Sequence, residues 1–293
     1  MDKRQRGGTA FLLRILCLTA LVLFTDMPAA RAQEKVIVTS GDGTALGAYL
    51  FRPSGSGPSP ALVFAHGCGG LLSQAGRINA RETAWARTLT SAGYVVLMVD
   101  SFTTRGIRNM CAPATFQGDV YRARPQDLYG ALAYLQAQSF VLPTKVGVMG
   151  WSLGGGAVLN ALRTDSSGRP PGLSPDHDFR AAVAFYPASC KPERQRGGWT
   201  SRVPLLVLLG TGDVWTPLDP CRTLLERSAA NGSPVQLKIY PGAYHDFDWP
   251  NLPYRERPEY RTAAGVVPVT GTDPGARADA LSRVPDFLAT YLK

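Results

Sequence analysis

The sequence has 293 residues, of which 45% are hydrophobic and 18% charged, a composition typical of a globular protein with a sizeable core. The formal net charge is +9, but the basic residues are dispersed, with neither a basic helix face nor interleaved aromatics, which argues against nucleic-acid binding. No internal repeat is visible, which excludes solenoid and propeller architectures.

The first 32 residues have the layout of a secretory signal peptide. Lys3, Arg4 and Arg6 are followed by a mostly apolar run over residues 11–24, and residues 30–32 read Ala-Arg-Ala, which a signal peptidase accepts. The apolar run is shorter than the roughly 20 residues that a membrane anchor, the alternative, would need. We expect cleavage after residue 32, a secreted or periplasmic protein without stable membrane insertion, and a mature net charge of +6, because the leader carries a net +3.

Strands and helices alternate along the rest of the chain. Residues 36–38 and 45–51 predict a hairpin, and short apolar runs then predict buried strands at 61–65, 94–99, 146–150, 181–186, 205–210 and 235–240. Helical patterns fall at 82–92, 125–138, 153–162, 218–230 and 277–292. Single helices between strands favour one α/β domain over residues 33–293, with a mostly parallel central sheet and helices on both faces. Ligands of such sheets bind at the carboxyl ends of the strands.

The strongest motif is Gly150-Trp151-Ser152-Leu153-Gly154, placed between a predicted strand and a predicted helix. It matches the G-x-S-x-G nucleophile elbow, in which a tight turn presents the serine hydroxyl and glycines on either side avoid clashes. We therefore predict that Ser152 is a nucleophile. The alternative, an inert glycine-rich turn, does not explain why the motif stands in this context.

A serine hydroxyl needs a base to accept its proton. His245 follows the last predicted strand and is the preferred base, whereas His66 is expected to shape its loop by hydrogen bonding and His177 to be solvated. The acid that orients the base is predicted to be Asp213, which gives the chain order Ser, Asp, His of α/β-hydrolases. The competitors for that role are Asp219 and Asp246.

An oxyanion requires donors that are already in place. The backbone N–H of Leu153 is one expected donor, and the loop His66-Gly67-Cys68-Gly69-Gly70 supplies the other, at Cys68 or else at Gly67. Metal binding is not expected, since the cysteines lack C-x-x-C spacing.

Four cysteines remain after the leader, Cys68, Cys111, Cys190 and Cys221, and an even count in an oxidising compartment suggests two disulfides with three possible connectivities. Cys68 and Cys111 follow neighbouring strands of the predicted fold, as do Cys190 and Cys221. We therefore predict these two pairs, the first bracing the oxyanion loop and the second the acid loop.

The chain resembles the dienelactone hydrolase family over about residues 36–292. The resemblance is carried by residues 66–70, by Asp100-Ser101-Phe102, by the elbow, by Gly212-Asp213 with Trp215-Thr216-Pro217, and by Tyr240-Pro241-Gly242-Ala243-Tyr244-His245-Asp246-Phe247. It implies a cofactor-free hydrolase of esters or lactones. The sequence departs from the namesake enzymes in having serine where they carry a cysteine nucleophile. The elbow alone is also similar to that of secreted cutinases and polyester hydrolases.

Aromatic residues near the predicted active edge could line an acyl pocket or could simply pack at the rim of the sheet, namely Phe102, Trp151, Tyr186, Trp215, Tyr244 and Trp249. Arg105 could bind a substrate carboxylate, with a solvated arginine as the alternative. The sequence thus predicts a secreted serine hydrolase that cleaves small-molecule or polymeric esters, or lactones, through an acyl-enzyme on Ser152. A peptidase of the same fold and a non-catalytic binding module are the competing interpretations.

Overall fold

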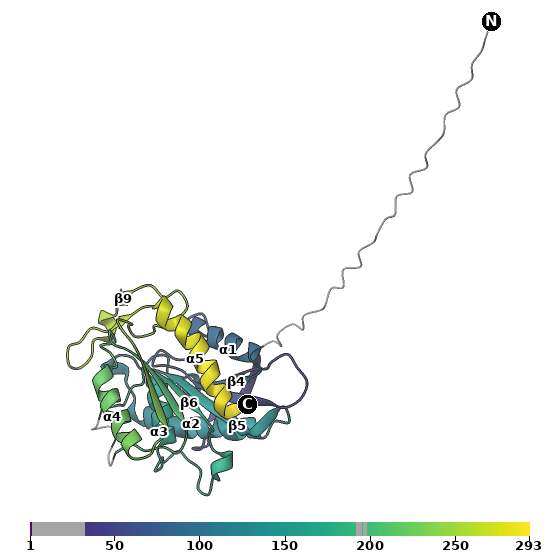
Figure 1. Ribbon diagram of the computed structural model, residues 1–293. Helices are drawn as coiled ribbons and strands as arrows, with labels where there is room; N and C mark the ends of the chain where they lie inside the picture. The colour runs from purple at the N-terminus through teal and green to yellow at the C-terminus, as the bar shows by residue number, and fades with distance from the viewer. Residues whose placement is uncertain (2–32, 192–194, 196–197) are drawn as a thin grey trace.

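A central sheet of eight strands organises the computed structural model, which describes residues 1, 33–191, 195 and 198–293 (Figure 1). The predicted signal peptide therefore lies outside the described residues. Along the sheet the strand order is β1-β2-β4-β3-β5-β6-β7-β8. The pairings are antiparallel from β1 to β4 and parallel from β4 to β8, so the sheet is mostly parallel, as predicted.

The strands are short, and the central ones are buried along most of their length. Their bounds are β1 Glu34–Thr39, β2 Ala45–Phe51, β3 Ser59–Ala65, β4 Val95–Val99, β5 Val141–Trp151, β6 Ala182–Phe185, β7 Leu205–Gly210 and β8 Val235–Tyr240. Every residue of β4, β6 and β7 is buried, because helices cover both faces of these strands and apolar side chains are favoured on each.

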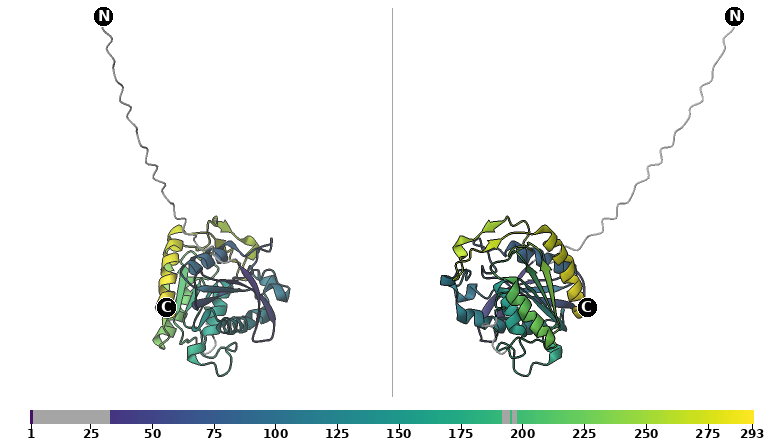
Figure 2. Two further views of the ribbon diagram at one scale, coloured as in Figure 1. Left: turned by 90° about the vertical axis from the view of Figure 1, so that its right-hand side faces the viewer. Right: turned by 60° about the vertical axis from the view of Figure 1, so that its left-hand side comes forward.

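Two layers of helices enclose the sheet (Figure 2). The helices are α1 Ala80–Ser91, α2 Gly118–Gln136, α3 Leu153–Leu162, α4 Leu218–Ala230 and α5 Pro274–Leu292. Helices α1 and α5 cover one face, whereas α2 and α3 cover the other. This three-layer arrangement is the α/β-hydrolase fold that the sequence predicts. No helix among the described residues is long and apolar enough to cross a membrane.

Helix α2 begins seven residues before its predicted start, and Pro125 lies inside it. A proline inside a helix has no N–H to donate and normally disrupts the ladder. Tertiary contacts stabilise the helix here: the carbonyl of Gln126, one residue further on, accepts a hydrogen bond from the N–H of Gly41 at 3.2 Å. Arg124 in the same turn donates to the backbone oxygen of His66 at 2.8 Å.

One segment was not anticipated by the sequence pattern. Between β8 and α5 the chain leaves the sheet and forms a small hairpin of β9 Arg255–Glu256 and β10 Val269–Thr270. We call residues 249–273 the excursion. It is tied to the segment after β8, because Gly271 N–H donates to His245 O at 3.1 Å and Asp273 N–H donates to Phe247 O at 3.1 Å.

Candidate active site

Ser152 occupies a strained turn between β5 and α3. Its φ of 53° and ψ of −116° lie outside the regions that non-glycine residues prefer, which is the conformation expected of a nucleophile elbow. The backbone holds it there: its N–H donates to Phe185 O at 3.0 Å, and its carbonyl accepts from Ala188 N–H at 2.9 Å. The serine is therefore fixed at the carboxyl end of the central strand.

The glycines of the elbow are required by close backbone contacts. A Cβ at position 154 would lie 2.0 Å from the carbonyl oxygen of Ala65, and one at position 150 would lie 2.5 Å from that of Gly154. A Cβ at position 156 would lie 2.3 Å from the hydroxyl of Tyr121 on α2. The first two contacts allow the tight turn, and the third allows α3 to approach α2 closely.

His245 and Asp213 form a buried hydrogen-bonded pair. The Nδ1 atom of His245 lies 2.7 Å from Asp213 Oδ2, and both side chains are almost fully buried. Asp213 is itself held, since Oδ1 accepts from the N–H groups of Trp215 and Thr216 and Oδ2 accepts from the hydroxyl of Thr216 at 2.7 Å. The pair thus fixes the imidazole with Nδ1 as the donor, which leaves Nε2 free to act as a base.

The electrostatics favour proton uptake by this imidazole. Burial acts to lower the pKa of His245, but the charge of Asp213 and the hydrogen bond to it act in the opposite direction and leave the pKa above its usual value. Asp246 adds to the rise, whereas the Arg81 guanidinium opposes it. A raised pKa makes the imidazole a stronger base toward a hydroxyl proton.

The other two histidines are occupied elsewhere. His66 is fully buried, with Nδ1 donating to Gly67 O at 2.8 Å and Nε2 accepting from Ser101 N–H at 3.2 Å. Burial, with a contribution from Arg124, lowers the pKa of His66 to about 3. It is therefore a neutral residue that shapes its loop, as predicted. His177 is exposed and pairs with Ser174 on the surface.

The competing acids have other partners. Asp219 is exposed and forms an ion pair with Arg222 at 2.7 Å. Asp246 adjoins the base in sequence, but its carboxylate accepts from Arg81 Nη1 at 2.7 Å. Asp213 is the one of the three that hydrogen bonds to His245.

A cavity of about 250 Å³ opens beside Ser152. Both predicted oxyanion donors, Cys68 and Leu153, line it together with Ser152. The loop after β3 lies directly on the elbow, since a Cβ at Gly67 would be 3.8 Å from that of Ser152. Ser152, the predicted nucleophile, and both predicted donors therefore meet at one cavity.

Two disulfides flank this cavity, and their pairing is the predicted one. Cys68 is bonded to Cys111, and Cys190 to Cys221; all four residues contribute to the lining. Met110 N–H donates to Cys68 O at 2.8 Å, so the first disulfide and a backbone bond hold the same two loops together.

Among the residues predicted to bind substrate, Phe102, Arg105 and Trp151 are engaged within the protein and do not line the cavity. Trp151 is fully buried and donates to Asp248 at 2.8 Å. Phe102 is also buried, with its ring edge-on to His66 at 4.5 Å. Arg105 is not solvated but forms a bidentate ion pair with Asp127, at 2.8 and 2.9 Å. Trp215, by contrast, lines the cavity.

A comparison with known families identifies the family of this chain. The model of the dienelactone hydrolase family matches residues 46–292, which is most of the chain. The chain belongs to the dienelactone hydrolase family. It is accordingly a hydrolase.

The individual relatives have low sequence identity to this protein. A stretch of 119 residues is 30% identical to the quorum-quenching protein AidA of Acinetobacter baumannii, covering 41% of this chain and 36% of that protein, so the match spans well under half of the relative. A probable 2-oxo-3-(5-oxofuran-2-ylidene)propanoate lactonase of Bradyrhizobium is 25% identical over 204 residues, or 68% of this chain and 78% of that one. The crystal structure of a dienelactone hydrolase-like promiscuous phosphotriesterase from metagenomic libraries superposes with a TM-score of 0.64 at 21% identity, covering 90% of this chain and all of the other. That likeness shows the fold.

The sequence analysis missed a buried cluster of charged side chains that lies next to His245 in this protein. Arg81 donates to Glu82 at 2.7 Å and to Tyr186 at 3.2 Å, as well as to Asp246. Burial acts against its charge, yet the surrounding groups, Glu82 first, keep the pKa of Arg81 well above its usual value. The ring of Tyr186 lies 4.4 Å from that of His245, so the cluster contacts this imidazole through Tyr186.

Asp248 is the second anchor of this region. Its carboxylate accepts from the indole N–H groups of Trp85 and Trp151 and from the hydroxyl of Tyr186, at 2.7, 2.8 and 2.5 Å. Sequence reasoning missed it because an isolated aspartate in a loop is usually exposed. No local signal could have indicated it, because its partners Trp85, Trp151 and Tyr186 come from distant parts of the sequence.

Proposed function

We propose that this protein is an exported serine hydrolase that cleaves carboxylic esters or lactones through an acyl-enzyme on Ser152. The observation that carries the proposal is the hydrogen bond between His245 Nδ1 and Asp213 Oδ2, on a serine-elbow fold of a hydrolase family. It orients the imidazole so that its Nε2 is the nitrogen available to the serine hydroxyl.

The proposed reaction has two halves. Ser152 Oγ attacks the carbonyl carbon while its proton passes to His245 Nε2, and the backbone N–H groups of Leu153 and Cys68 stabilise the oxyanion. The imidazolium then protonates the departing alcohol oxygen, which leaves the acyl group on the serine. A water molecule gives its proton to His245 and attacks the acyl carbon, and collapse of the second intermediate returns the serine hydroxyl. In a lactone the departing oxygen stays attached to the acyl group.

Several features support the substrate class and the location. A relative that covers two thirds of this chain is named as a lactonase, which supports including cyclic esters. Two disulfides flank the site, and disulfides persist in oxidising compartments, which supports a secreted or periplasmic protein. The predicted signal peptide would direct it there, with residues 33–293 acting as one domain.

The test compares the wild type with Ser152→Ala and His245→Ala on p-nitrophenyl esters, a five-membered lactone and dipeptide nitroanilides. We expect ester or lactone turnover that falls at least about 10⁴-fold in both variants. His177→Ala is the matched control, because that histidine is exposed, and it should retain full activity. Turnover of the nitroanilides alone would favour a peptidase, and no turnover by folded wild type would contradict the proposal.

A separate measurement tests export. N-terminal sequencing of the protein recovered outside the cytoplasm should begin at Gln33. An N-terminus at Met1 in that fraction would contradict cleavage of the leader.

A further inference from the structure

The excursion places an aromatic side chain behind the wall of the active-site cavity. Tyr260 follows β9, and its ring is stacked on that of Trp215, with centroids 5.5 Å apart and planes 19° from parallel. Trp215 in turn lies 4.9 Å from the imidazole of His245 and lines the cavity. The guanidinium of Arg257 lies 4.7 Å from the ring of Tyr260. Tyr260 is thus packed against Trp215, on the side of the cavity where Asp213 and His245 lie.

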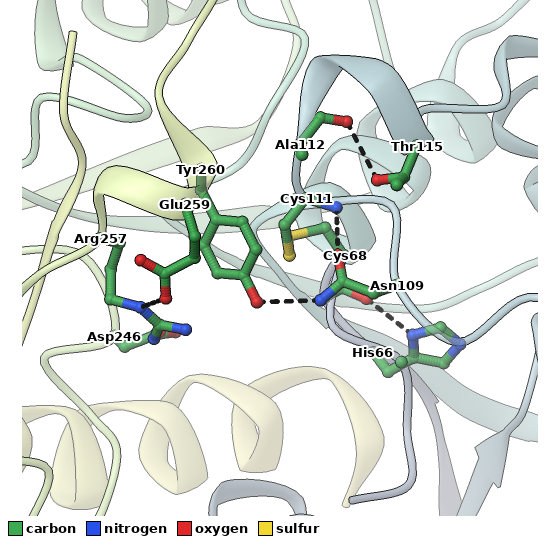
Figure 3. The surroundings of a disulfide bond; sticks show 12 residues. His66, Cys68, Asn109, Cys111, Ala112, Thr115, Asp246, Arg257, Glu259 and Tyr260 are labelled. Atoms are coloured by element: carbon green, nitrogen blue, oxygen red, sulfur yellow. Dashed lines mark hydrogen bonds and ion pairs between the residues drawn. A yellow bond between two sulfur atoms is a disulfide. The ribbon is translucent and has the colours of Figure 1, made fainter. Parts of the chain in front are cut away.

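The hydroxyl of Tyr260 is hydrogen bonded toward the other side of the cavity, where the loop of the predicted oxyanion donor Cys68 lies. It accepts a hydrogen bond from Asn109 Nδ2 at 3.0 Å, and Asn109 Oδ1 accepts from Cys111 N–H at 2.7 Å (Figure 3). Cys111 is bonded to Cys68, the expected oxyanion residue. Figure 3 shows Tyr260 directed across toward Asn109 and this disulfide.

These contacts form a continuous chain around the cavity. It runs from His245 through Trp215 and Tyr260 to Asn109 and the Cys68–Cys111 disulfide. The excursion that carries Tyr260 is itself bonded to the backbone of His245 through Gly271. Tyr260 is therefore joined to both walls, and a change in its position would be transmitted to Trp215 on one side and to Cys111 on the other.

The cavity is small for a ligand-binding site. Its volume of about 250 Å³ lies below the range of about 300–1,000 Å³ that is usual for sites that bind drug-sized ligands. Trp215 has the largest side chain of the residues that line the cavity, so a change in its orientation would change the width of the cavity.

We infer that Tyr260 is a positioning residue that holds Trp215 in place and thereby restricts the site to esters or lactones whose group in the cavity is compact. The inference rests on the proposed function and specifies its substrate class. Tyr260 does not touch the reacting atoms. It acts through Trp215 and Asn109, so its loss should change selectivity more than the chemical step.

The experiment measures kcat and KM for p-nitrophenyl acetate, butyrate, hexanoate and decanoate, and for acetate esters of alcohols of the same lengths. Wild type should prefer the short members of one series, which identifies the part of the ester that occupies the cavity. Tyr260→Phe keeps the stacked ring but removes the bond to Asn109, and we expect the short-to-long ratio of kcat/KM to fall about fivefold, the worth of one ordinary hydrogen bond. Tyr260→Ala also removes the stacking, and we expect a fall of about 25-fold.

The change should lie in KM, with kcat on butyrate within about twofold of wild type, because the triad is untouched. Tyr254→Phe is the matched control: this tyrosine lies on the same excursion but is exposed and packs edge-on against Tyr244, so the ratio should not change. Unchanged ratios in Tyr260→Phe and Tyr260→Ala, each folded by circular dichroism, would overturn the inference. If Tyr260→Ala does not fold, the Tyr260→Phe ratio decides alone. Absence of all ester turnover in wild type would instead count against the proposed function.

Discussion

Replacing Asp213 by asparagine should inactivate the enzyme by reversing the tautomer of its base. Oδ1 of Asp213 accepts from two backbone N–H groups, at 2.8 and 2.9 Å, so an asparagine would keep its carbonyl oxygen there. Its amide group would then face His245 Nδ1, in the place of the oxygen that now lies 2.7 Å away. Because the amide donates, Nδ1 would have to accept, and the proton would move to Nε2. That nitrogen could no longer take a proton from Ser152.

The expected loss in kcat is about 10⁴-fold, which corresponds to about 5.4 kcal/mol of transition-state stabilisation. The pH profile carries a second signature. In wild type, kcat/KM should fall as the pH drops through the pKa of His245, which Asp213 raises above its usual value. Removing that charge lowers the pKa, so the acid limb of the residual activity should move to lower pH.

The assay is a kcat/KM profile between pH 4 and 9 on p-nitrophenyl butyrate, with Asp219→Asn as the control. Asp219 is exposed and pairs with Arg222, so its replacement should leave both the rate and the acid limb unchanged. A loss below tenfold in Asp213→Asn, with an unmoved acid limb, would refute the assignment of the acid.

Three further outcomes follow from the packing around the site. Gly154→Ala should lower the free energy of unfolding by at least about 2 kcal/mol in denaturant titration, because its Cβ would lie 2.0 Å from a carbonyl oxygen. Gly55→Ala is the control and should be neutral, because the space around Gly55 is open. Equal stabilities of the two variants would contradict the close approach at Gly154. Reducing the Cys68–Cys111 disulfide should lower kcat/KM at least tenfold while the far-UV circular dichroism spectrum is unchanged, because the disulfide braces the predicted oxyanion loop. Full activity in a sample whose thiol count confirms reduction would argue against that role. Asp248→Ala should cost about 3 kcal/mol or more, because two indole N–H groups and a tyrosine hydroxyl would lose their buried acceptor; a loss under 1 kcal/mol would show that they find other partners.

The sheet and the elbow could be predicted because single local signals decide them. A strand covered on both faces must be apolar throughout, and β4 and β7 are continuous apolar runs whose bounds match the prediction to within one residue. The elbow has a backbone requirement at each glycine, so the five-residue pattern directly reports the geometry around Ser152. Cysteine pairing followed once the strand order placed Cys68 near Cys111.

Features that depend on long-range contacts could not be predicted. The start of α2 was placed at Pro125 because a proline favours the first turn of a helix, whereas contacts with Gly41 and His66 stabilise the helix through it. The strands β9 and β10 have two residues each, too few to show a period.

The roles of charged side chains were the least visible in the sequence. Arg105 was expected to be solvated or to meet a substrate, and nothing near it in sequence indicates Asp127, 22 residues away, as its partner. Arg81 and Asp248 are buried because the fold surrounds them with acceptors and donors from distant segments. Burial of a charge depends on such partners, which a local pattern does not contain.

The central claim is that the hydroxyl of Ser152 is the group that becomes covalently modified during turnover. The most direct measurement is reaction of the folded protein with a fluorophosphonate, followed by peptide mapping by mass spectrometry. The account predicts one adduct per chain, on the peptide that contains Ser152, formed slowly or not at all in His245→Ala. An adduct on a different residue, or equally fast labelling of Ser152→Ala, would contradict it.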